Sequence, residues 1–248
     1  MCVAAIAWNA HPDWQLVAVG NRDEFHARPA APLAEWEEPS GILAGRDLQS
    51  GGTWLGVSPA GQFVLVTNLR GFGVPDPSRT SRGELVTRLL EGKGAPDTLD
   101  RYNPFNLIHV DTTGAHFLTN RPQATRAQLA HGVYGLSNGS LDEPWAKTMQ
   151  LKTALLDWLV GAKGDLEVLF KALTNEALGD FGLHPQEPSD ISIEASETPV
   201  FIRNPIYGTR CSTVVTVDRT GHGRIVERRF SESGQFSGES ALEFRWPG

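Results

Sequence analysis

Short apolar segments joined in pairs by turn residues restrict the fold of this chain more than any other feature of its sequence. Segments 3–8 and 14–19 form one such pair, and segments 51–57 and 61–68 form another. Strand-length apolar runs separated by Pro, Gly, Asn or Asp are typical of β-hairpins. The chain therefore opens with antiparallel pairing, which argues against a parallel doubly wound sheet.

Helical patterns interrupt the hairpins twice. Residues 82–91 carry leucines at helical spacing, and residues 144–160 and 165–173 form a second group. Further strands are predicted at 105–110, 115–119, 131–137, 212–217, 224–230 and 241–246. This grouping predicts an α+β fold with antiparallel sheets and grouped helices. The stretch 26–52, rich in Pro, Gly, Ala and charge, is predicted to be a long surface loop.

Composition and charge narrow the class of protein. The 248 residues are 40% hydrophobic and 21% charged, which is typical of one large globular domain or two small ones. The formal net charge of −7 argues against a nucleic-acid partner. No apolar run approaches the roughly 20 residues that span a bilayer, and no charged leader is visible. We therefore expect a cytoplasmic protein without a transmembrane segment, and a homo-oligomer stays open.

Cys2 carries the most chemical information. Initiator methionine is commonly removed ahead of a small residue, and its removal would place a thiol and a free α-amine on Cys2. An α-amine with a pKa of about 7.7–8.0 can act as the base for the thiol nucleophile. The alternative is an ordinary second residue. The other cysteine is Cys211, and we expect both thiols to be reduced, with a Cys2–Cys211 disulfide as the alternative.

Charged and amide side chains end several of the predicted strands. Arg22 and Asp23 follow the second strand, where Arg22 can stabilise a thiolate or an oxyanion and Asp23 can hold the α-amine. Asn68 and Asn138 end two later strands and offer amide donors for an oxyanion hole. Arg210 precedes a strand near the end of the sequence. The alternatives are surface salt bridges for the charges and turn formation for the asparagines.

Many of these residues lie in motifs that occur together in one family. The motifs are Met1-Cys2, Asn21-Arg22-Asp23-Glu24-Phe25 with Arg28-Pro29, Gly51-Gly52-Thr53-Trp54-Leu55-Gly56, Thr67-Asn68, Arg82-Gly83-Glu84-Leu85-Val86, Phe105-Asn106-Leu107, Tyr134-Gly135-Leu136-Ser137-Asn138 with Pro144-Trp145, and Tyr207-Gly208-Thr209-Arg210. In this order, they resemble the NRDE family, which is the family of transport and Golgi organisation protein 2. The resemblance implies a single domain over 1–248.

The NRDE family is similar to the N-terminal-nucleophile hydrolases. This implies a four-layer αββα sandwich, in which two antiparallel sheets lie between helical layers. Cys2 resembles the nucleophile of the bile-salt hydrolase and penicillin V acylase branch, and Arg22 resembles the arginine beside it. Asn68 and Asn138 resemble the oxyanion-binding and amine-binding asparagines of that branch, and Arg210 its late arginine. Asp23 departs from the pattern, because it is adjacent to Arg22, whereas the acidic residue of that branch follows after an interval.

Three hypotheses of function remain. In the first, Cys2 attacks a small amide, ester or thioester. The predicted substrate-binding residues are Asn21, Trp54 and Thr67. In the second, which the resemblance also implies, the same pocket binds and moves haem, acyl-CoA or lipid without cleaving it. The third is an interaction protein that uses 26–52 or 179–199. No histidine spacing or glycine-rich phosphate loop indicates a metal or nucleotide cofactor, so haem enters only under the second hypothesis.

Overall fold

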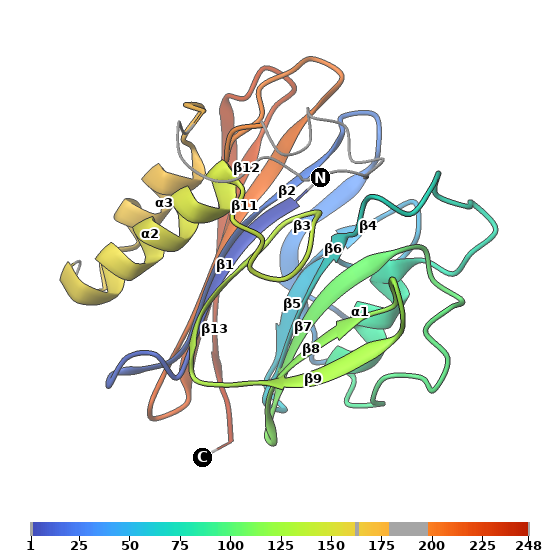
Figure 1. The fold of residues 1–248 in the computed structure, drawn as a ribbon. Coiled ribbons are helices and arrows are strands. Elements are labelled where there is room, and N and C mark those ends of the chain that lie inside the picture. Colours follow the sequence, from blue (N-terminus) through green and yellow to red (C-terminus); the bar gives the residue numbers. More distant parts are fainter. Residues whose placement is uncertain (1, 162–163, 179–197, 248) are drawn as a thin grey trace.

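Two antiparallel β-sheets form the centre of the computed structural model, which describes residues 2–161, 164–178 and 198–247 (Figure 1). In spatial order, the strands of the first sheet are β10 (Gly132–Leu136), β1 (Cys2–Trp8), β2 (Trp14–Phe25), β11 (Tyr207–Asp218), β12 (His222–Phe230) and β13 (Phe236–Arg245). Strands from the beginning, middle and end of the sequence are therefore neighbours. The central strand β2 pairs with β1 on one side and with β11 on the other.

The second sheet follows the order of the sequence. Its strands are β3 (Ala30–Glu35), β4 (Leu43–Asp47), β5 (Leu55–Ser58), β6 (Gln62–Asn68), β7 (Phe105–Asp111), β8 (Gly114–Thr119) and β9 (Thr125–Leu129). Each strand pairs antiparallel with the next one along the chain. The sheet is therefore a meander in which short connections join most successive strands. Strands β6 and β7 are the exception, because residues 69–104, including a helix, lie between them.

Strand β1 shows why the first sheet has an apolar sequence. Ile6 and Trp8 belong to the apolar cluster between the two sheets, whereas Val3 and Ala5 belong to the cluster beneath two helices. Successive side chains of a strand point to opposite faces. Because both faces of β1 are covered, its sequence is a continuous apolar run without a polar alternation.

Helices cover the outer faces of both sheets. Helices α2 (Ala146–Gly161) and α3 (Leu166–Leu173) pack on the first sheet, where Trp158 and Phe170 join the apolar cluster of β1 and β2. Helix α1 (Arg82–Leu90) packs on the second sheet through Leu85 and Leu89. Figure 1 shows the resulting order of layers: two helices, sheet, sheet, helix. The prediction of an α+β fold with two antiparallel sheets and grouped helices is confirmed.

Three strands differ from the sequence-based prediction: β3, β4 and β9. The predicted loop 26–52 contains β3 and β4. Strand β3 lies at the edge of its sheet and buries only Leu33, so its sequence has no apolar alternation. Strand β9, at the other edge, is almost entirely exposed and was not predicted. Backbone hydrogen bonds to one neighbouring strand hold such edge strands in place, so their sequences need no regular hydrophobic pattern.

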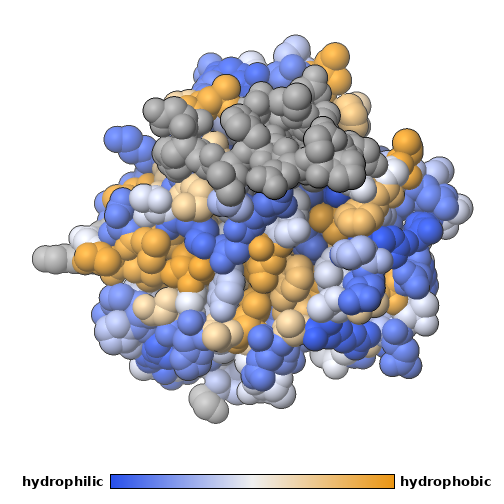
Figure 2. Space-filling view, in the orientation of Figure 1, coloured by the Kyte–Doolittle hydropathy of each residue, from blue (hydrophilic) through white to orange (hydrophobic). Residues whose placement is uncertain are grey.

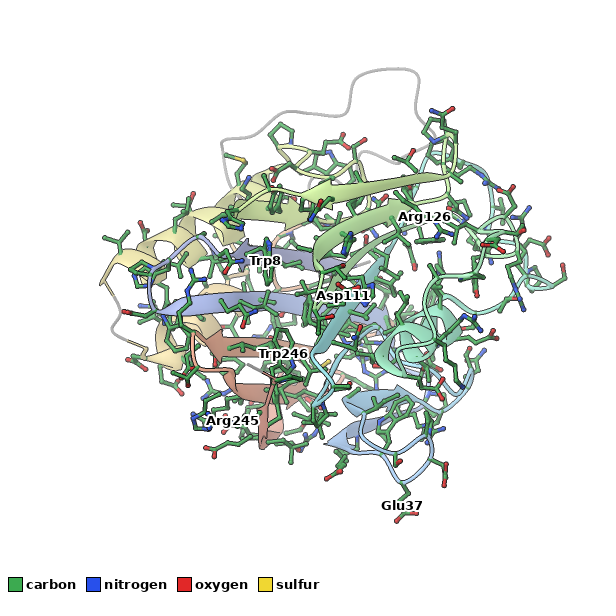
Figure 3. The ribbon with its side chains drawn as sticks, turned by 90° about the horizontal axis from the view of Figure 1, so that it is seen from below. Trp8, Glu37, Asp111, Arg126, Arg245 and Trp246 are labelled. Carbon is green, nitrogen blue, oxygen red and sulfur yellow. The ribbon has the colours of Figure 1, made fainter. Side chains whose placement is uncertain are left out.

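The surface and the ends of the sheets complete the description. Seen from below in Figure 3, Trp8 and Trp246 lie in the interior, whereas Glu37 and Arg245 project at the periphery. On the face shown in Figure 2, apolar side chains form separate patches among hydrophilic ones. Within the described residues, no helix has the length and apolar character needed to cross a membrane. The assignment of 1–248 to one domain stays a prediction.

Candidate functional site

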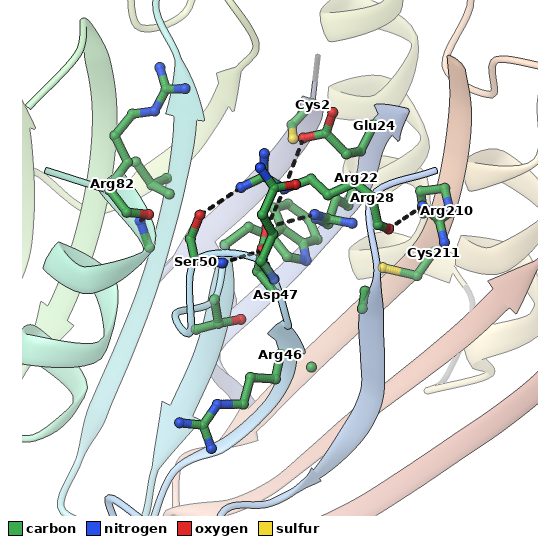
Figure 4. A pocket seen from close by; sticks show the side chains of 18 of the residues that line it. Cys2, Arg22, Glu24, Arg28, Arg46, Asp47, Ser50, Arg82, Arg210 and Cys211 are labelled. Carbon is green, nitrogen blue, oxygen red and sulfur yellow. Dashed lines mark hydrogen bonds and ion pairs between the residues drawn. The ribbon is translucent and has the colours of Figure 1, made fainter. Parts of the chain in front are cut away.

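Three side chains form a row across the first sheet at the end of β1. Cys2 of β1 is paired with Arg22 of β2, which is in turn paired with Cys211 of β11. Directly paired residues share a face of the sheet, and the even-numbered residues of β1 face the second sheet. Cys2, Arg22 and Cys211 all line a cavity of about 530 Å³ (Figure 4).

The row excludes the disulfide left open by the sequence. Cys2 and Cys211 are separated by two strand spacings, roughly 10 Å, and a disulfide needs Cα atoms within about 7 Å. Both thiols are free. Burial raises the pKa of the Cys2 thiol and raises that of the Cys211 thiol well above its ordinary value. Neither thiol is therefore a thiolate at neutral pH without a base or a further positive charge beside it.

The other side of Cys2 carries the end of β10. The Ser137 hydroxyl donates to the carbonyl oxygen of Cys2 at 2.8 Å. Asn138 is fully buried, and its Nδ2 donates to the carbonyl oxygen of Asn68 at 2.7 Å. That bond fixes the orientation of the amide, because only its nitrogen, and not its oxygen, can donate to a carbonyl. The Oδ1 of Asn138 is left buried with no partner among the described residues, so it is an acceptor that awaits a donor.

Asp23 lies on the opposite face of β2 from Arg22, since the two are successive residues of one strand. The Thr209 hydroxyl donates to Oδ1 of Asp23 at 2.7 Å. Burial raises the pKa of this carboxyl to about 6. The alternation of faces explains how an acid adjacent to Arg22 lies in a different environment from it.

Lys147 is a buried cation that the sequence analysis missed. Its side chain is 1% exposed on α2, and its ammonium donates to Thr198 Oγ1 at 2.9 Å. Burial lowers its pKa to about 8, while the negative charge of Asp23 opposes that effect. The spacing of Lys147 from Leu151 and Leu155 was the available signal, because residues four apart share one face of a helix.

Asp47 joins two further arginines at the cavity wall. Its Oδ2 accepts from Arg22 Nη2 at 3.1 Å and from Arg28 Nε at 2.6 Å. Burial alone would raise the pKa of Asp47, but the hydrogen bonds from Arg28 and the backbone of Ser50 outweigh it and lower the pKa. Arg28 and Asp47 were not predicted as site residues. They come from the segment 26–52, whose interpretation as a loop hid the placement of Asp47 at the end of a strand.

A bulge places Arg210. The pairing of β11 with β2 shifts register between Thr209 and Cys211, so Arg210 is the extra residue. A bulge redirects the side chain that it carries. Nη1 of Arg210 donates to the carbonyl oxygens of Phe25 and Arg28, at 2.9 and 3.0 Å.

The structure brings together most, but not all, of the predicted site residues. The described lining of the cavity includes Cys2, Arg22, Asp23, Trp54, Asn68 and Arg210. Asn138 and Thr67 are outside the described lining, where Asn138 is hydrogen-bonded to the backbone of Asn68 and the buried hydroxyl of Thr67 has no hydrogen-bond partner among the described residues. Asn21 is fully buried on the helical side, where its Nδ2 donates to the carbonyls of Leu173 and Val200. The structure gives Asn21 a packing role, and its substrate contact stays a prediction.

The described residues contain no group of three or more His, Cys, Asp or Glu side chains arranged to hold a metal ion. The described cavity lining is instead rich in arginine, with Cys2 and Cys211 as its sulfur atoms. Its chemical groups are therefore two free thiols, amide dipoles, guanidinium cations and carboxylates.

Fold and site together define an α+β protein of two antiparallel sheets with a cysteine-bearing, arginine-lined cavity. The chain belongs to the Transport and Golgi organisation 2 family, whose model matches residues 1–232. The family resemblance inferred from the sequence motifs is thereby confirmed.

Relatives cover nearly the whole chain. The Transport and Golgi organization protein 2 homolog of Bos taurus is 31% identical, over 99% of this chain and 99% of that protein. The Homo sapiens homolog is 32% identical over 92% of each, and the Drosophila melanogaster protein is 27% identical over 92% of this chain and 91% of its own length. Among solved structures, a Caenorhabditis elegans N-acylethanolamine-hydrolyzing acid amidase ortholog is similar, with a TM-score of 0.49 and 12% identity over 86% of this chain and 92% of that chain.

Proposed function

We propose that this chain is an N-terminal-nucleophile cysteine hydrolase or acyltransferase that acts on a small amide, ester or thioester. Removal of Met1 leaves Cys2 as the nucleophile, and the order of layers, two helices, sheet, sheet and helix, supports the proposal. The observation that carries the proposal is the position of Cys2 in the cavity between Arg22 and the unpartnered Oδ1 of Asn138. An acceptor without a donor beside residue 2 suits a free α-ammonium group.

The mechanism begins with proton transfer within Cys2. The α-amine takes the thiol proton, and Sγ attacks the acyl carbon to form a tetrahedral oxyanion. The amide of Asn68 and backbone N–H groups donate to that oxyanion. The ammonium then returns its proton to the departing amine, alcohol or thiol. Water hydrolyses the resulting thioester, with the α-amine as base a second time.

The neighbours of Cys2 divide the remaining tasks. Asn138 has already used its donor on Asn68, so it accepts from the α-ammonium and does not stabilise the oxyanion. Asp23, whose pKa is about 6, is ionised at pH 7.5 and supports the ammonium from the other side. Arg22 stabilises the thiolate, although Asp47 shares its charge. Arg210, with Trp54 and Thr67, contributes to substrate binding.

The intact mass of the protein, expressed with no N-terminal tag and treated briefly with iodoacetamide, tests this proposal. We expect loss of Met1 and one fast alkylation that maps to Cys2, with Cys211 unlabelled because burial raises its pKa far more. Cys2→Ala should remove the label, and Cys211→Ser should retain it. Retention of Met1, or labelling of Cys211 alone, would contradict the proposal. A screen of acyl amides and thioesters against the wild type and Cys2→Ala then identifies turnover.

A binding protein without catalysis is the second candidate, and the raised pKa of the Cys2 thiol favours it. The described cavity lining suits an anionic ligand such as acyl-CoA, or haem with its carboxylates against the arginines and a thiolate of Cys2 or Cys211 near the iron. Histidine is absent from that described lining, so a histidine contact to iron is not favoured. Haem titration that leaves the Soret band of free haem unchanged would exclude the haem version.

A further inference from the structure

The cavity has the opposite charge to the chain as a whole. The chain has a formal net charge of −7. The described lining holds seven arginines against five carboxylates: Arg22, Arg28, Arg46, Arg79, Arg82, Arg210 and Arg229 against Asp23, Glu24, Asp47, Asp76 and Glu227. This local excess of cations makes the cavity attractive to anions.

Most of the carboxylates are already bound. Asp47 is shared by Arg22 and Arg28, and Glu24 lies 3.9 Å from Arg28. In the same way, Arg79 is paired with Asp76 at 3.7 Å, and Arg229 with Glu227 at 3.4 Å. Arg46 has no carboxylate partner among the described residues, but its guanidinium stacks on Trp36 at 4.3 Å. Arg46, Arg82 and Arg210 are therefore the lining arginines without a carboxylate partner in the described residues. Arg46 uses its Nε and Nη1 on the carbonyl oxygens of Gly51 and Glu38, so Arg82 and Arg210 are the two with more free donors.

Arg82 and Arg210 are held in the same manner. Nη1 of Arg82 donates to the carbonyl oxygen of Pro104 at 2.9 Å, and Nη1 of Arg210 donates to two carbonyl oxygens. In the described part of the chain, neither Nε nor Nη2 of these two guanidiniums has a partner, and neither guanidinium pairs with a carboxylate. Both side chains are partly buried, which is unfavourable for a cation that lacks an anion.

The two arginines come from opposite sides of the cavity. Arg82 opens α1, which packs on the second sheet, whereas Arg210 lies on the bulge of β11 in the first sheet. Figure 4 shows them on opposite sides of the view, with Cys2 and Arg22 between. A guanidinium that keeps an edge of N–H donors free is suited to bidentate recognition of phosphate or carboxylate oxygens.

We propose that Arg82 and Arg210 form an anion-binding subsite, and that the acyl compound bound beside Cys2 carries a phosphate or carboxylate group. The inference rests on the proposed function, because it takes Cys2 as the reacting residue. It adds the requirement that the substrate be anionic, which a cysteine nucleophile alone does not impose. Neutral amides and esters are then poor substrates, and the anionic group selects among acyl compounds.

The rates at which Cys2 reacts with iodoacetate and with iodoacetamide test the subsite, because the two reagents differ in charge and carry the same leaving group. We expect the ratio of the iodoacetate rate to the iodoacetamide rate to exceed that of a free cysteine peptide by about tenfold or more. Arg82→Gln and Arg210→Gln should each lower the ratio by about fivefold. Arg224→Gln is the matched control, since Arg224 is exposed and outside the described lining.

A second measurement does not require a reactive cysteine. Inorganic phosphate and acetate are titrated separately against the wild type, Cys2→Ala and Arg82→Gln, and thermal unfolding is followed. Stabilisation of the wild type and Cys2→Ala, but not of Arg82→Gln, supports the subsite, and the more effective anion distinguishes phosphate from carboxylate.

The outcomes separate the two proposals. If Cys2 reacts with neither reagent while an anion still stabilises the protein, the nucleophile fails and the subsite stands. If Cys2 reacts with both reagents at a ratio that Arg82→Gln and Arg210→Gln leave unchanged, and neither anion stabilises the protein, the subsite is refuted and the nucleophile stands.

Discussion

Asp23 and Lys147 are two charges that the fold holds away from water, and their protonation connects the site to stability. The folded-state pKa of Asp23 is about 6, above its ordinary value of 3.8. The native state therefore binds more protons than the unfolded state between these pH values. The contribution of Asp23 favours folding below pH 3.8 and is lost as pH rises through 6.

Asp23→Asn should remove this pH dependence, because the amide oxygen still accepts from Thr209 and carries no charge. We expect the variant to match the wild type near pH 4 and to exceed its free energy of unfolding by up to about 3 kcal/mol at pH 7.5, at 1.36 kcal/mol per pKa unit. Urea unfolding at both pH values measures the difference. A variant less stable than the wild type at pH 7.5 would show that ionised Asp23 stabilises the fold.

Lys147→Met sharpens the same experiment. Loss of the ammonium removes a positive charge that favours the ionised form of Asp23, so the pKa of Asp23 should rise. The stability of Lys147→Met should therefore fall at a higher pH than that of the wild type. Lys152→Met is the control on the same helix, since Lys152 is bound to Asp142 at 2.5 Å instead. An equal shift in both variants would mean that the effect is one of net charge and not of the pair.

At the scale of elements, the N-terminus of α1 is fixed by contact between two glycines. A Cβ at Gly52 would lie 2.3 Å from the carbonyl carbon of Gly83 and 2.8 Å from its Cα. These atoms are backbone and cannot turn aside. The contact holds α1 against the segment between β4 and β5, and it thereby places Arg82 at the cavity.

Gly52→Ala should therefore displace α1 and cost about 1–3 kcal/mol of stability, as overpacking of a close contact does. Gly161→Ala is the matched control, because a Cβ there meets nothing within 4 Å. We expect it to be neutral or slightly stabilising at the end of α2. Urea unfolding of both variants measures the costs, and equal stability of Gly52→Ala and the wild type would contradict the rigid contact.

The elements also show where sequence is sufficient. Hairpins with a buried face were predicted, because apolar runs of strand length persist when helices and a second sheet cover both faces. The edge strands β3 and β9 and the short strand β4 were not predicted, since backbone groups that every residue carries make their pairing. The same contrast holds in the site. Cys2, Arg22 and Asn68 lie in recognisable motifs, whereas no local pattern places Asp47 at the site. The helical spacing of Lys147 from Leu151 and Leu155 indicates that it is buried, but not that it lies near Asp23.

The whole molecule depends on the apolar cluster between the two sheets. Strands from both ends of the described chain contribute to it, including Ile6 of β1 and Phe244 of β13 against Phe63 of β6. The cavity is lined by residues of both sheets, such as Arg210 of the first sheet and Asn68 of the second. Movement of the sheets relative to each other would separate Arg210 from Arg82, and the site therefore requires that the two sheets behave as one body.

Trp246 offers the most direct test of that requirement. Its indole is 4% exposed within the cluster, and its Nε1 donates to the carbonyl oxygen of Ser58 at the end of β5. Trp246→Ala should cost about 3–5 kcal/mol. Arg245→Ala, at the exposed neighbouring residue, should change stability by less than about 0.5 kcal/mol.

Amide hydrogen exchange distinguishes one cooperative body from two. In Trp246→Ala, the slowest amides of β6 in the second sheet and of β11 in the first should lose the same free energy of protection, equal to the loss seen in urea unfolding. Loss confined to β12 and β13 would mean that the sheets unfold separately. Single-domain behaviour over 1–248 would then fail as well, because a chain with one core exposes its most protected amides in a single global transition.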